Sequence, residues 1–504
     1  MLLKKNNLFF FIYNSIKVGR YYMANMGESD NKWKILTALS LGVLMAGINT
    51  SIANVSLPNI QIYFQSNLSV TGLVSTAYFI SFIGFALFAS KLGDRYGHDK
   101  IFIIGVISFV VTSILCSIAP SIELLIFCRF LQGIAGSILL SGPMVILEKA
   151  FSVIHLGKAY GIYSVFAAVG LTIGPAIGGI LQGMFNWRAI FLINVPIGIL
   201  TFFLSVYSLD KIETMDVRWD IKGLIGIFLS IALIIATMTF IEDKDYIYFF
   251  VSLILSLISI VATIKIEQNA EDPLLNLSLF KNKTFATSSI NLHLAYVAEY
   301  LFIYGLPYFL EKVVHDGSSM VGLILSAAPI LMIFIAPLSG EITDRKGYVL
   351  PTIAGCIICI ISSILIIGTN TESHGLAIFI IFAIYGIGCG LLQSPINKAI
   401  MISVPEKYSG TASGVIQASR NLGISFAVCY GSLIYALSVS AQNMQKNVLF
   451  GSAAQQLTSG LHYIAIFSII LSVIVIILTV VGKNEKKKKK IVFKFFKHYN
   501  PKNK

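Results

Sequence analysis

The sequence predicts an all-α polytopic membrane protein with 14 transmembrane helices, arranged as two six-helix bundles plus two inserted helices. Of its 504 residues, 56% are hydrophobic and only 12% are charged, whereas about 25% of an ordinary soluble domain is charged. Apolar runs of about 20 residues, enough to cross ~30 Å of hydrocarbon, recur along the chain. A loop motif also returns 250 residues after its first appearance, which indicates an internal duplication.

The helices are expected where the apolar runs lie between polar connections. Eight runs precede an amphipathic connection and six follow it, near residues 35–57, 70–90, 100–119, 122–147, 158–183, 187–208, 221–241, 246–265, 284–309, 317–338, 349–368, 374–403, 408–437 and 460–482. Because eight helices separate the repeated loops, we expect two six-helix units with two helices between them. The divisions are then an N-terminal extension at 1–34, bundles at 35–208 and 284–482, linking helices with an amphipathic loop at 209–283, and a polybasic tail at 483–504.

Basic residues in the connections predict the orientation. If the chain starts in the cytoplasm, the loops on that side carry 14 lysines and arginines, and the outer loops carry four. Because cytoplasmic loops of membrane proteins are enriched in these residues, both termini of this multi-pass cell-membrane protein are expected in the cytoplasm. The early apolar run "LFFFIY" is too short for the core of a signal peptide, so the extension is expected to be cytoplasmic as well.

Much of the net charge of +13 lies in the C-terminal tail, where ten lysines accompany one glutamate. A polybasic segment directly after a membrane helix is typical of an orientation signal and of an anchor for anionic lipid headgroups. We therefore expect the lipid bilayer, and no nucleic acid, as the partner of this tail.

The cysteines give no sign of metal or redox chemistry. Cys356 and Cys359 have the spacing of a redox pair, but an apolar helix disfavours the thiolate that such chemistry needs. All six cysteines lie in apolar runs and are expected to be packing residues: Cys116, Cys128, Cys356, Cys359, Cys389 and Cys429. We predict no metal, no disulfide and no cofactor, and no enzyme, because no nucleophile, base and orienting group occur together.

The duplicated loops each follow a predicted helix at its cytoplasmic end. "ASKLGDRYG" covers 89–97 and "LSGEITDRKG" covers 338–347, so Asp94 and Asp344 occupy equivalent positions. "CRFLQG" and "CGLLQS" repeat in the same way in the helices near 122–147 and 374–403. Taken alone, such a loop is a charged tight turn in which Gly97 supplies backbone freedom.

Together these motifs resemble the major facilitator superfamily. The first loop is similar to its glycine-framed Asp-Arg motif, and "GLTIGPAIGG" (170–179) matches the antiporter motif of its drug:proton exporters. "CRFLQGIAG", "NWRAIFLINVPIG" and "NVSLP" resemble further motifs of these exporters and of their fourteen-helix branch. The resemblance runs from about residue 35 to 482 and implies a proton-coupled exporter that works by alternating access.

The resemblance gives the loops a gating role. Each aspartate is able to bond helix N-terminal amides or an arginine across the two bundles. The expected gating residues are Asp94, Arg95, Gly97, Asp344, Arg345 and Gly347. In the first loop Ser90, His98 and Asp99 depart from the family pattern, which puts the strength of that latch in question.

The antiporter motif predicts a thin, bent helix. Gly170, Gly174 and Gly178 recur every four residues, so they share one helix face and allow a neighbouring backbone to approach closely. With Pro175 and Gly179 added, this helix suits an interface between two bundles that rock against each other. The alternative to this role is that the glycine face serves only ordinary tight packing against a neighbouring helix.

The resemblance also makes the helices near 35–57, 122–147, 284–309 and 374–403 the walls of a central cavity. Members of the fourteen-helix branch usually carry a titrating aspartate where this chain has Asn49, which cannot titrate. Glu299, 250 residues after Asn49 on the repeat-related helix, is therefore the expected proton-coupling residue. The expected substrate-cavity residues are Asn49, Asn54, Arg129, Gln132, His293, Tyr300 and Gln393.

Glu299 and Arg129 are expected to face each other across the bundles, because the helical rise places them at similar depth. Burial favours the protonated acid and a nearby arginine favours the carboxylate, so small movements of the arginine would load or release a proton. The alternative is a fixed buried pair of Glu299 with Arg129 or Arg420. For His293, ordinary packing is the alternative to a place in the cavity. Arg420 is expected to form a structural pair. Lys398 is expected to extend toward the inner surface.

An apolar cavity with one acid and several aromatic side chains suits lipophilic cations, since aromatic faces attract positive charge. We predict export of lipophilic or cationic drug-like compounds against a proton gradient, by a monomer whose partners are the substrate and protons. The closest alternative is export of a specific metabolite, such as an amino acid, a sugar or an organic anion. A sensor that transports nothing is a different class, disfavoured because no cytoplasmic loop is long enough for a signalling domain.

Overall fold

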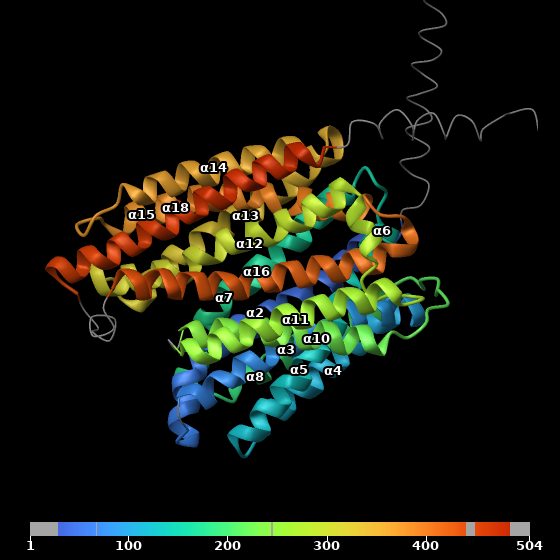
Figure 1. The fold of residues 1–504 in the computed structure, drawn as a ribbon, viewed down its shortest axis with the longest axis horizontal. Helices are drawn as coiled ribbons and strands as arrows, with labels where there is room; N and C mark the ends of the chain where they lie inside the picture. Colours follow the sequence, from blue (N-terminus) through green and yellow to red (C-terminus); the bar gives the residue numbers. More distant parts are fainter. Residues whose placement is uncertain (1–28, 67, 243–244, 440–448, 484–504) are drawn as a thin grey trace, which may run out of the picture.

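The structure, a computed structural model, describes residues 29–66, 68–242, 245–439 and 449–483. Within these ranges every regular element is a helix, which confirms the all-α prediction. Most of the predicted N-terminal extension and nearly all of the polybasic tail lie outside the described residues. Figure 1 shows long helices that run side by side along the molecule.

The N-terminal bundle contains the six predicted crossings, two of which are interrupted. Pro143 begins α6 directly after α5, at a position where its missing N–H costs no hydrogen bond. Ile193 separates the short α8 from α9. The helices are α2 (Lys32–Phe64), α3 (Leu68–Tyr96), α4 (His98–Ile118), α5 (Ile122–Ser141), α6 (Pro143–Ala150), α7 (Leu156–Met184), α8 (Ala189–Leu192) and α9 (Asn194–Ser208).

A helical hairpin links this bundle to the C-terminal one. The hairpin consists of α10 (Ile221–Glu242) and α11 (Tyr246–Asn269), and the 3₁₀-helix η1 (Leu277–Lys281) follows it. The C-terminal bundle contains α12 (Lys283–Phe309), the π-helix η2 (Leu310–Val314), α13 (Ser318–Lys346), α14 (Val349–Ile367), α15 (Gly375–Ile402), the 3₁₀-helix η3 (Glu406–Tyr408), α16 (Ser409–Ser438) and α18 (Gly451–Val481).

Thirteen stretches of the described chain are long and apolar enough to cross a membrane. The 27-residue α12 is not among them, although it has the length. It carries Asn291, His293 and Glu299. Because α12 packs against α15, α16 and α18, other helices cover much of this more polar span.

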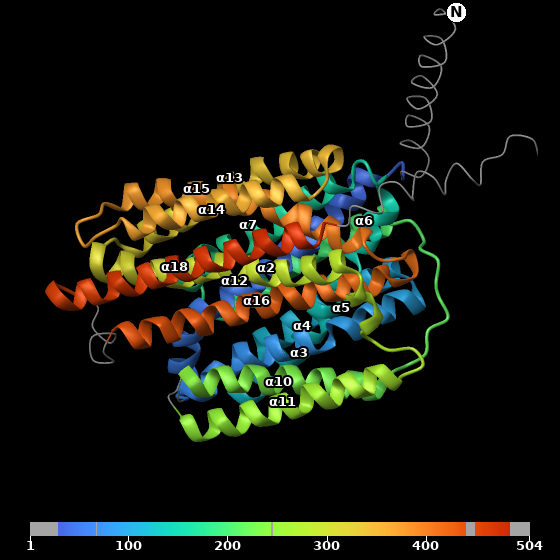
Figure 2. The same cartoon turned by 45° about the horizontal axis from the view of Figure 1, so that its top comes forward.

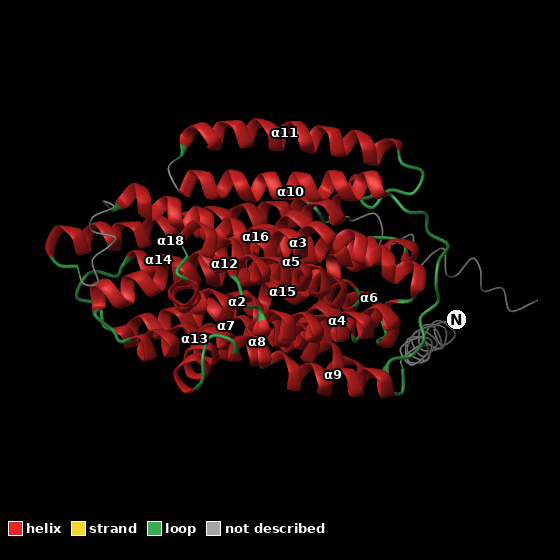
Figure 3. Ribbon diagram, turned by 90° about the horizontal axis from the view of Figure 1, so that it is seen from below, coloured by secondary structure: helices red, strands yellow, loops and turns green. Residues whose placement is uncertain are grey.

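Contacts between the bundles follow two seams. α7 packs against α13 and α15 at the first, and α3 packs against α16 at the second. α10 contacts both α3 and α16, so the hairpin covers the α3–α16 seam from outside. Figures 2 and 3 show α10 beside α16 and α3, with α11 outermost.

Two glycines form the turns of the duplicated loops. Gly97 has a φ of 97° and Gly347 a φ of 85°, a region that side chains disfavour. Each directly follows a long helix, α3 or α13, so the two loops are equivalent turns, as their sequences predict. We call the end of the molecule that carries both turns the basic end.

Candidate functional site

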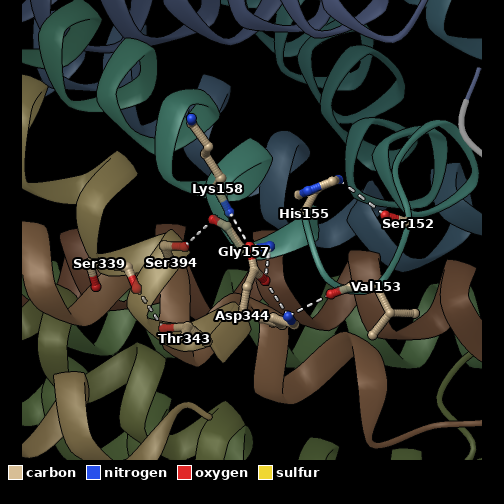
Figure 4. Close-up of polar contacts among 10 residues, drawn as sticks. Ser152, Val153, His155, Gly157, Lys158, Ser339, Thr343, Asp344 and Ser394 are labelled. Atoms are coloured by element: carbon tan, nitrogen blue, oxygen red, sulfur yellow. Dashed lines mark hydrogen bonds and ion pairs between the residues drawn. The ribbon is translucent and has the colours of Figure 1, made fainter. Parts of the chain in front are cut away.

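Asp344 joins the two bundles at the basic end. It lies in the last turn of α13, and its carboxylate accepts hydrogen bonds from the backbone amides of Gly157 (2.8 Å) and Lys158 (3.1 Å) at the start of α7 (Figure 4). Amides in the first turn of a helix have no partner within the helix and attract negative charge. Asp344 therefore caps a helix of the other bundle, which is the bond that the sequence predicts.

Lys398 supplies a counter-charge to this carboxylate. From α15, its Nζ pairs with Asp344 and donates to the Val153 carbonyl at 2.7 Å. The two paired side chains are only 6% and 4% exposed. Lys398 extends toward the basic end, the predicted inner side, but a carboxylate and a carbonyl hold its ammonium inside the seam. We call Asp344, Lys398 and the two α7 amides the Asp344 latch.

The first loop is arranged differently. Asp94 lies against Gly410 at the start of α16, as Asp344 lies against Gly157, but His98 Nε2 of its own bundle is 2.9 Å from its carboxylate. The hydrogen bond across the bundles comes from Ser90, whose hydroxyl donates to the Gly410 carbonyl. Ser90, which departs from the family pattern, therefore gives the first loop an uncharged hydrogen bond between the bundles. The second loop has the charged contact of Asp344 at the equivalent place.

The loop arginines make local contacts. Arg95 donates to the Val217 carbonyl at 3.0 Å and lies 4.7 Å from the centre of the Trp219 ring, in the connection before α10. Arg345 pairs with Glu341, one turn earlier on α13, at 2.5 Å. Within the two loops, the hydrogen bonds between the bundles are therefore made by Asp344 and Ser90 rather than by these arginines.

Gly340 lets α13 approach α7 closely. A Cβ at this position would overlap the Gly157 carbonyl and lie 2.7 Å from Lys158 Cα. Replacing Gly340 with alanine should hold the basic end open and lower transport about tenfold, since overpacking costs about 1–3 kcal/mol. Dye transport by reconstituted protein measures this. The control is Ser90→Ala, which loses one neutral hydrogen bond and should keep most activity; equal losses in both variants would contradict the expectation.

The glycine face of α7 packs within the N-terminal bundle. A Cβ at Gly170 would lie 2.6 Å from the Leu44 carbonyl oxygen, and one at Gly174 would lie 3.0 Å from the Ile48 carbonyl oxygen. Gly178 continues this face onto α2 at Ile52. The glycine face thus fits the tight-packing alternative, because α2 of the same bundle occupies it, while another part of α7 packs against α13 and α15 of the other bundle.

The start of α7 makes the contact with the other bundle. A Cβ at Gly161 would lie 2.9 Å from Pro337 Cα of α13, whereas one at Gly179 would meet no heavy atom of the described residues within 4 Å. The side chain of Pro175 lies outside the described part of the chain. The seam is thus closed near the basic end and less crowded around Gly179.

A hydrogen-bonded network surrounds Arg129 in the N-terminal bundle. Arg129 donates to the Val74 carbonyl (3.0 Å) and to Gln132 (2.6 Å), and Gln132 donates to Ser113 (2.8 Å). The guanidinium also lies 4.3 Å from the centre of the Tyr78 ring. Carbonyl, amide and aromatic groups therefore compensate this buried cation, and none of the described carboxylates pairs with it.

Asn194 extends the network to the first helix. Its side-chain amide donates to Ser113 (3.1 Å) and to Asn49 (3.2 Å). Asn49, Arg129 and Gln132 are each at most 1% exposed. These predicted cavity residues form one buried network within a single bundle. The side chain of Asn54, also on α2, is not among those that the structure describes.

The prediction that Arg129 faces Glu299 is wrong. The rise along a helix gives depth but no direction, and the hydrogen bonds of Arg129 all stay within the N-terminal bundle. Arg129 and Gln132 are three residues apart on one face of α5, so they bond each other. That spacing is the sequence signal that indicates the real partner.

Glu299 lies in the C-terminal bundle beside Gln393. Gln393 Nε2 donates to the Glu299 carboxylate at 3.0 Å, which joins α12 to α15. Glu299 is half-buried, and none of the described residues forms an ion pair with it. Its neighbour Tyr300 is buried in the core of the same bundle. A carboxylate at this depth is costly and usually marks a functional site.

His293 and Arg420 lie where α12 meets α16. His293 Nδ1 is 3.4 Å from the Ser419 carbonyl oxygen, and its ring packs edge-on against Phe426, which fits the packing alternative. Arg420 is 6% exposed and attracts the Glu299 charge without forming an ion pair with it. A fixed Glu299–Arg420 pair is thus absent among the described side chains.

Sequence reasoning missed three partners of the predicted residues. Lys398 completes the Asp344 latch, and Asn194 and Ser113 connect Asn49 to Gln132. Asn194 stands in an apolar run, where a polar amide needs a buried partner. Ser113 gave no such signal, because single serines are common in membrane helices.

Comparisons with known proteins agree with this architecture. A family model described as Major Facilitator Superfamily matches residues 39–428. The chain is 30% identical over 411 residues to "Riboflavin transporter RibZ" of Clostridioides difficile (strain 630), covering 81% of this chain and 89% of that protein. It is 28% identical over 416 residues to "Multidrug resistance protein Stp" of Mycobacterium tuberculosis (strain CDC 1551 / Oshkosh), covering 81% and 77%.

A solved structure shares the fold. The crystal structure of the human organic anion transporter MFSD10 (TETRAN) matches with a TM-score of 0.61, over 88% of this chain and 100% of that one. The sequence identity is 12%, so this match speaks to the fold alone.

Proposed function

The chain belongs to the major facilitator superfamily, and from that membership we propose that it is a fourteen-helix, proton-coupled exporter of lipophilic or cationic drug-like compounds. α12 would be the fourteenth span, beside the 13 clearly apolar ones. The basic end would face the cytoplasm of the cell membrane, as the loop lysines and arginines predict. The protein would act as a monomer on its substrate and protons.

Glu299 is the observation that carries the proposal. It is a half-buried carboxylate in a membrane span, bonded by the neutral amide of Gln393. Because no salt bridge to a described residue holds it ionised, it can gain and lose a proton without breaking an ion pair. Protonation would cancel the attraction for a cationic substrate in the same cavity, so proton entry would favour substrate release.

The Asp344 latch supports alternating access. In the structure it closes the basic end, so the central residues would communicate with the outer side. Release of Asp344 from the α7 amides would let α13 and α7 part and admit substrate from the cytoplasm. Closure of the latch behind the substrate would then commit it to export.

The names of two relatives support drug-like substrates. "Multidrug resistance protein Stp" and "Multidrug transporter protein MdtP" of Bacillus subtilis are 28% and 26% identical to this chain. The 30% identical relative is named as a riboflavin transporter, which favours export of a single metabolite as the second candidate. Both candidates use the same coupling residue and the same latch.

Export of a fluorescent cation tests the proposal. In a bacterial host that lacks its own exporters, expression should lower the steady-state accumulation of ethidium several-fold, and a protonophore should abolish the difference because the driving force is the proton gradient. Whole-cell fluorescence measures both effects. Accumulation equal to that of cells carrying an empty vector would favour the metabolite candidate, and export that survives the protonophore would contradict proton coupling.

A further inference from the structure

Three polar side chains are buried between the bundles with unsatisfied atoms. Nε of Arg420, both polar side-chain atoms of Gln417 and the hydroxyl of Tyr163 form no hydrogen bond of normal geometry with the described residues. The residues are 6%, 1% and 0% exposed. Buried polar groups are normally bonded, since leaving one unsatisfied costs about 1–3 kcal/mol. Three such residues in one place point to a ligand that satisfies them in another state of the protein.

The group is built from both bundles. Gln417 and Arg420 are three residues apart on α16 and so share a helix face. Tyr163 comes from α7 and lies beside both of them. The ring centre of Tyr296, on α12, is 5.9 Å from Arg420 Cζ. We call Tyr163, Tyr296, Gln417 and Arg420 the Arg420 cluster.

Parting of the bundles would open the cluster. Tyr163 lies on the same helix as Gly157, two turns further along, and Gly157 is held by Asp344. When the Asp344 latch releases α7, Tyr163 would move away from α16 and leave Gln417 and Arg420 facing the opened space. The cluster would then be accessible from the basic end, which is the side from which an exporter takes its substrate.

The donors of the cluster match an acidic group. A guanidinium binds a carboxylate through two parallel hydrogen bonds, and the Gln417 amide and the Tyr163 hydroxyl can each donate one more. Glu299, three residues after Tyr296 on α12, is near enough to Arg420 for their charges to attract, but none of the described carboxylates forms an ion pair with Arg420. The tyrosine rings beside Arg420 offer aromatic surface.

We propose that the Arg420 cluster binds the carboxylate of the transported compound while Glu299 attracts its cationic group. The preferred cargo is then an aromatic zwitterion rather than a simple aromatic cation. This inference rests on the proposed export function and narrows its substrate class. It also assigns Arg420 a role in substrate binding, in place of the structural pairing expected from the sequence.

Two dyes that differ only at one group provide the test. Rhodamine 6G is a cationic ethyl ester, and the free acid of the same dye is a zwitterion. Fluorescence polarisation with the purified full-length protein in nanodiscs should show tighter binding of the free acid. Tyr163→Phe and Gln417→Leu should each raise its dissociation constant about tenfold, the loss expected for one hydrogen bond to a charged group, and leave the ester within about twofold.

Tyr160→Phe is the matched control. It removes a buried hydroxyl from α7, the helix that also carries Tyr163. This hydroxyl donates to the Met144 carbonyl at 3.2 Å and lies outside the cluster. Both dyes should therefore bind as they do to the wild type. Wild-type protein that binds the free acid no more tightly than the ester would overturn the inference, as would equal losses for both dyes in the cluster variants. Export is measured separately in proteoliposomes. Selective binding without gradient-driven export would refute the proposed function and leave the cluster as a binding site.

Discussion

Replacing Glu299 with glutamine should abolish proton-driven export and weaken binding of a cationic substrate moderately. Glutamine has nearly the same shape and can still accept the hydrogen bond from Gln393, but it carries no titratable proton. Export from proteoliposomes under an imposed pH gradient should fall to the level of empty liposomes. The dissociation constant for the free-acid dye should rise about tenfold, a change of ~1.4 kcal/mol, because the negative charge that attracts its cationic group is lost.

The control for this variant is Glu341→Gln. Glu341 is a carboxylate on α13 that pairs locally with Arg345 at 2.5 Å, so its loss should leave proton coupling unchanged. If Glu299→Gln retains the proton dependence of the wild type, Glu299 is not the coupling residue. If the variant binds the dye as tightly as the wild type, Glu299 does not attract the cationic group of the substrate.

Replacing Asp344 with asparagine should shift the protein toward a state that is open at the basic end. The change leaves the buried Lys398 without a counter-charge, and breaking a buried ion pair by removing one partner costs about 3–5 kcal/mol. That cost favours the open state by roughly two to three orders of magnitude. Hydrogen exchange followed by mass spectrometry should show faster exchange at the Gly157 and Lys158 amides, and transport should fall sharply.

Asp94→Asn provides the internal comparison. The Asp94 carboxylate contacts His98 of its own bundle, so its loss should change exchange at α7 little and transport far less. Adding Lys398→Met to Asp344→Asn should recover part of the closed population, because the unpaired buried charge is removed as well. Equal effects of the two asparagine variants, or no recovery in the double variant, would show that the latch does not depend on this charge pair.

The sequence predicts the helices well because they depend on local hydropathy. All 14 predicted runs coincide with helices or helix pairs of the structure. The duplicated loops also follow from sequence, because a repeated Gly-framed Asp-Arg motif requires the same turn twice. The motif also indicates the contact of Asp344, since an acid at a helix end has few roles other than capping and pairing.

The side-chain partners depend on tertiary packing and were less predictable. A lysine near the end of an apolar helix, such as Lys398, usually extends toward the membrane surface, and only the position of α13 shows that Asp344 is its partner there. Depth along a helix suggested Arg129 as the partner of Glu299, but direction around the helix decides the contact. The unsatisfied atoms of Gln417 and Tyr163 have no sequence signature at all.

The position of the α10–α11 hairpin makes the two sides of the molecule unequal. α10 contacts both α3 and α16 and so lies across the seam with the neutral Ser90 contact, whereas the charged latch lies at the α7–α13 seam. A rocking motion would therefore separate α7 from α13 more than it separates α3 from α16, where the hairpin covers the seam. Compounds dissolved in the bilayer would enter laterally between α7 and α13, because the hairpin blocks entry between α3 and α16.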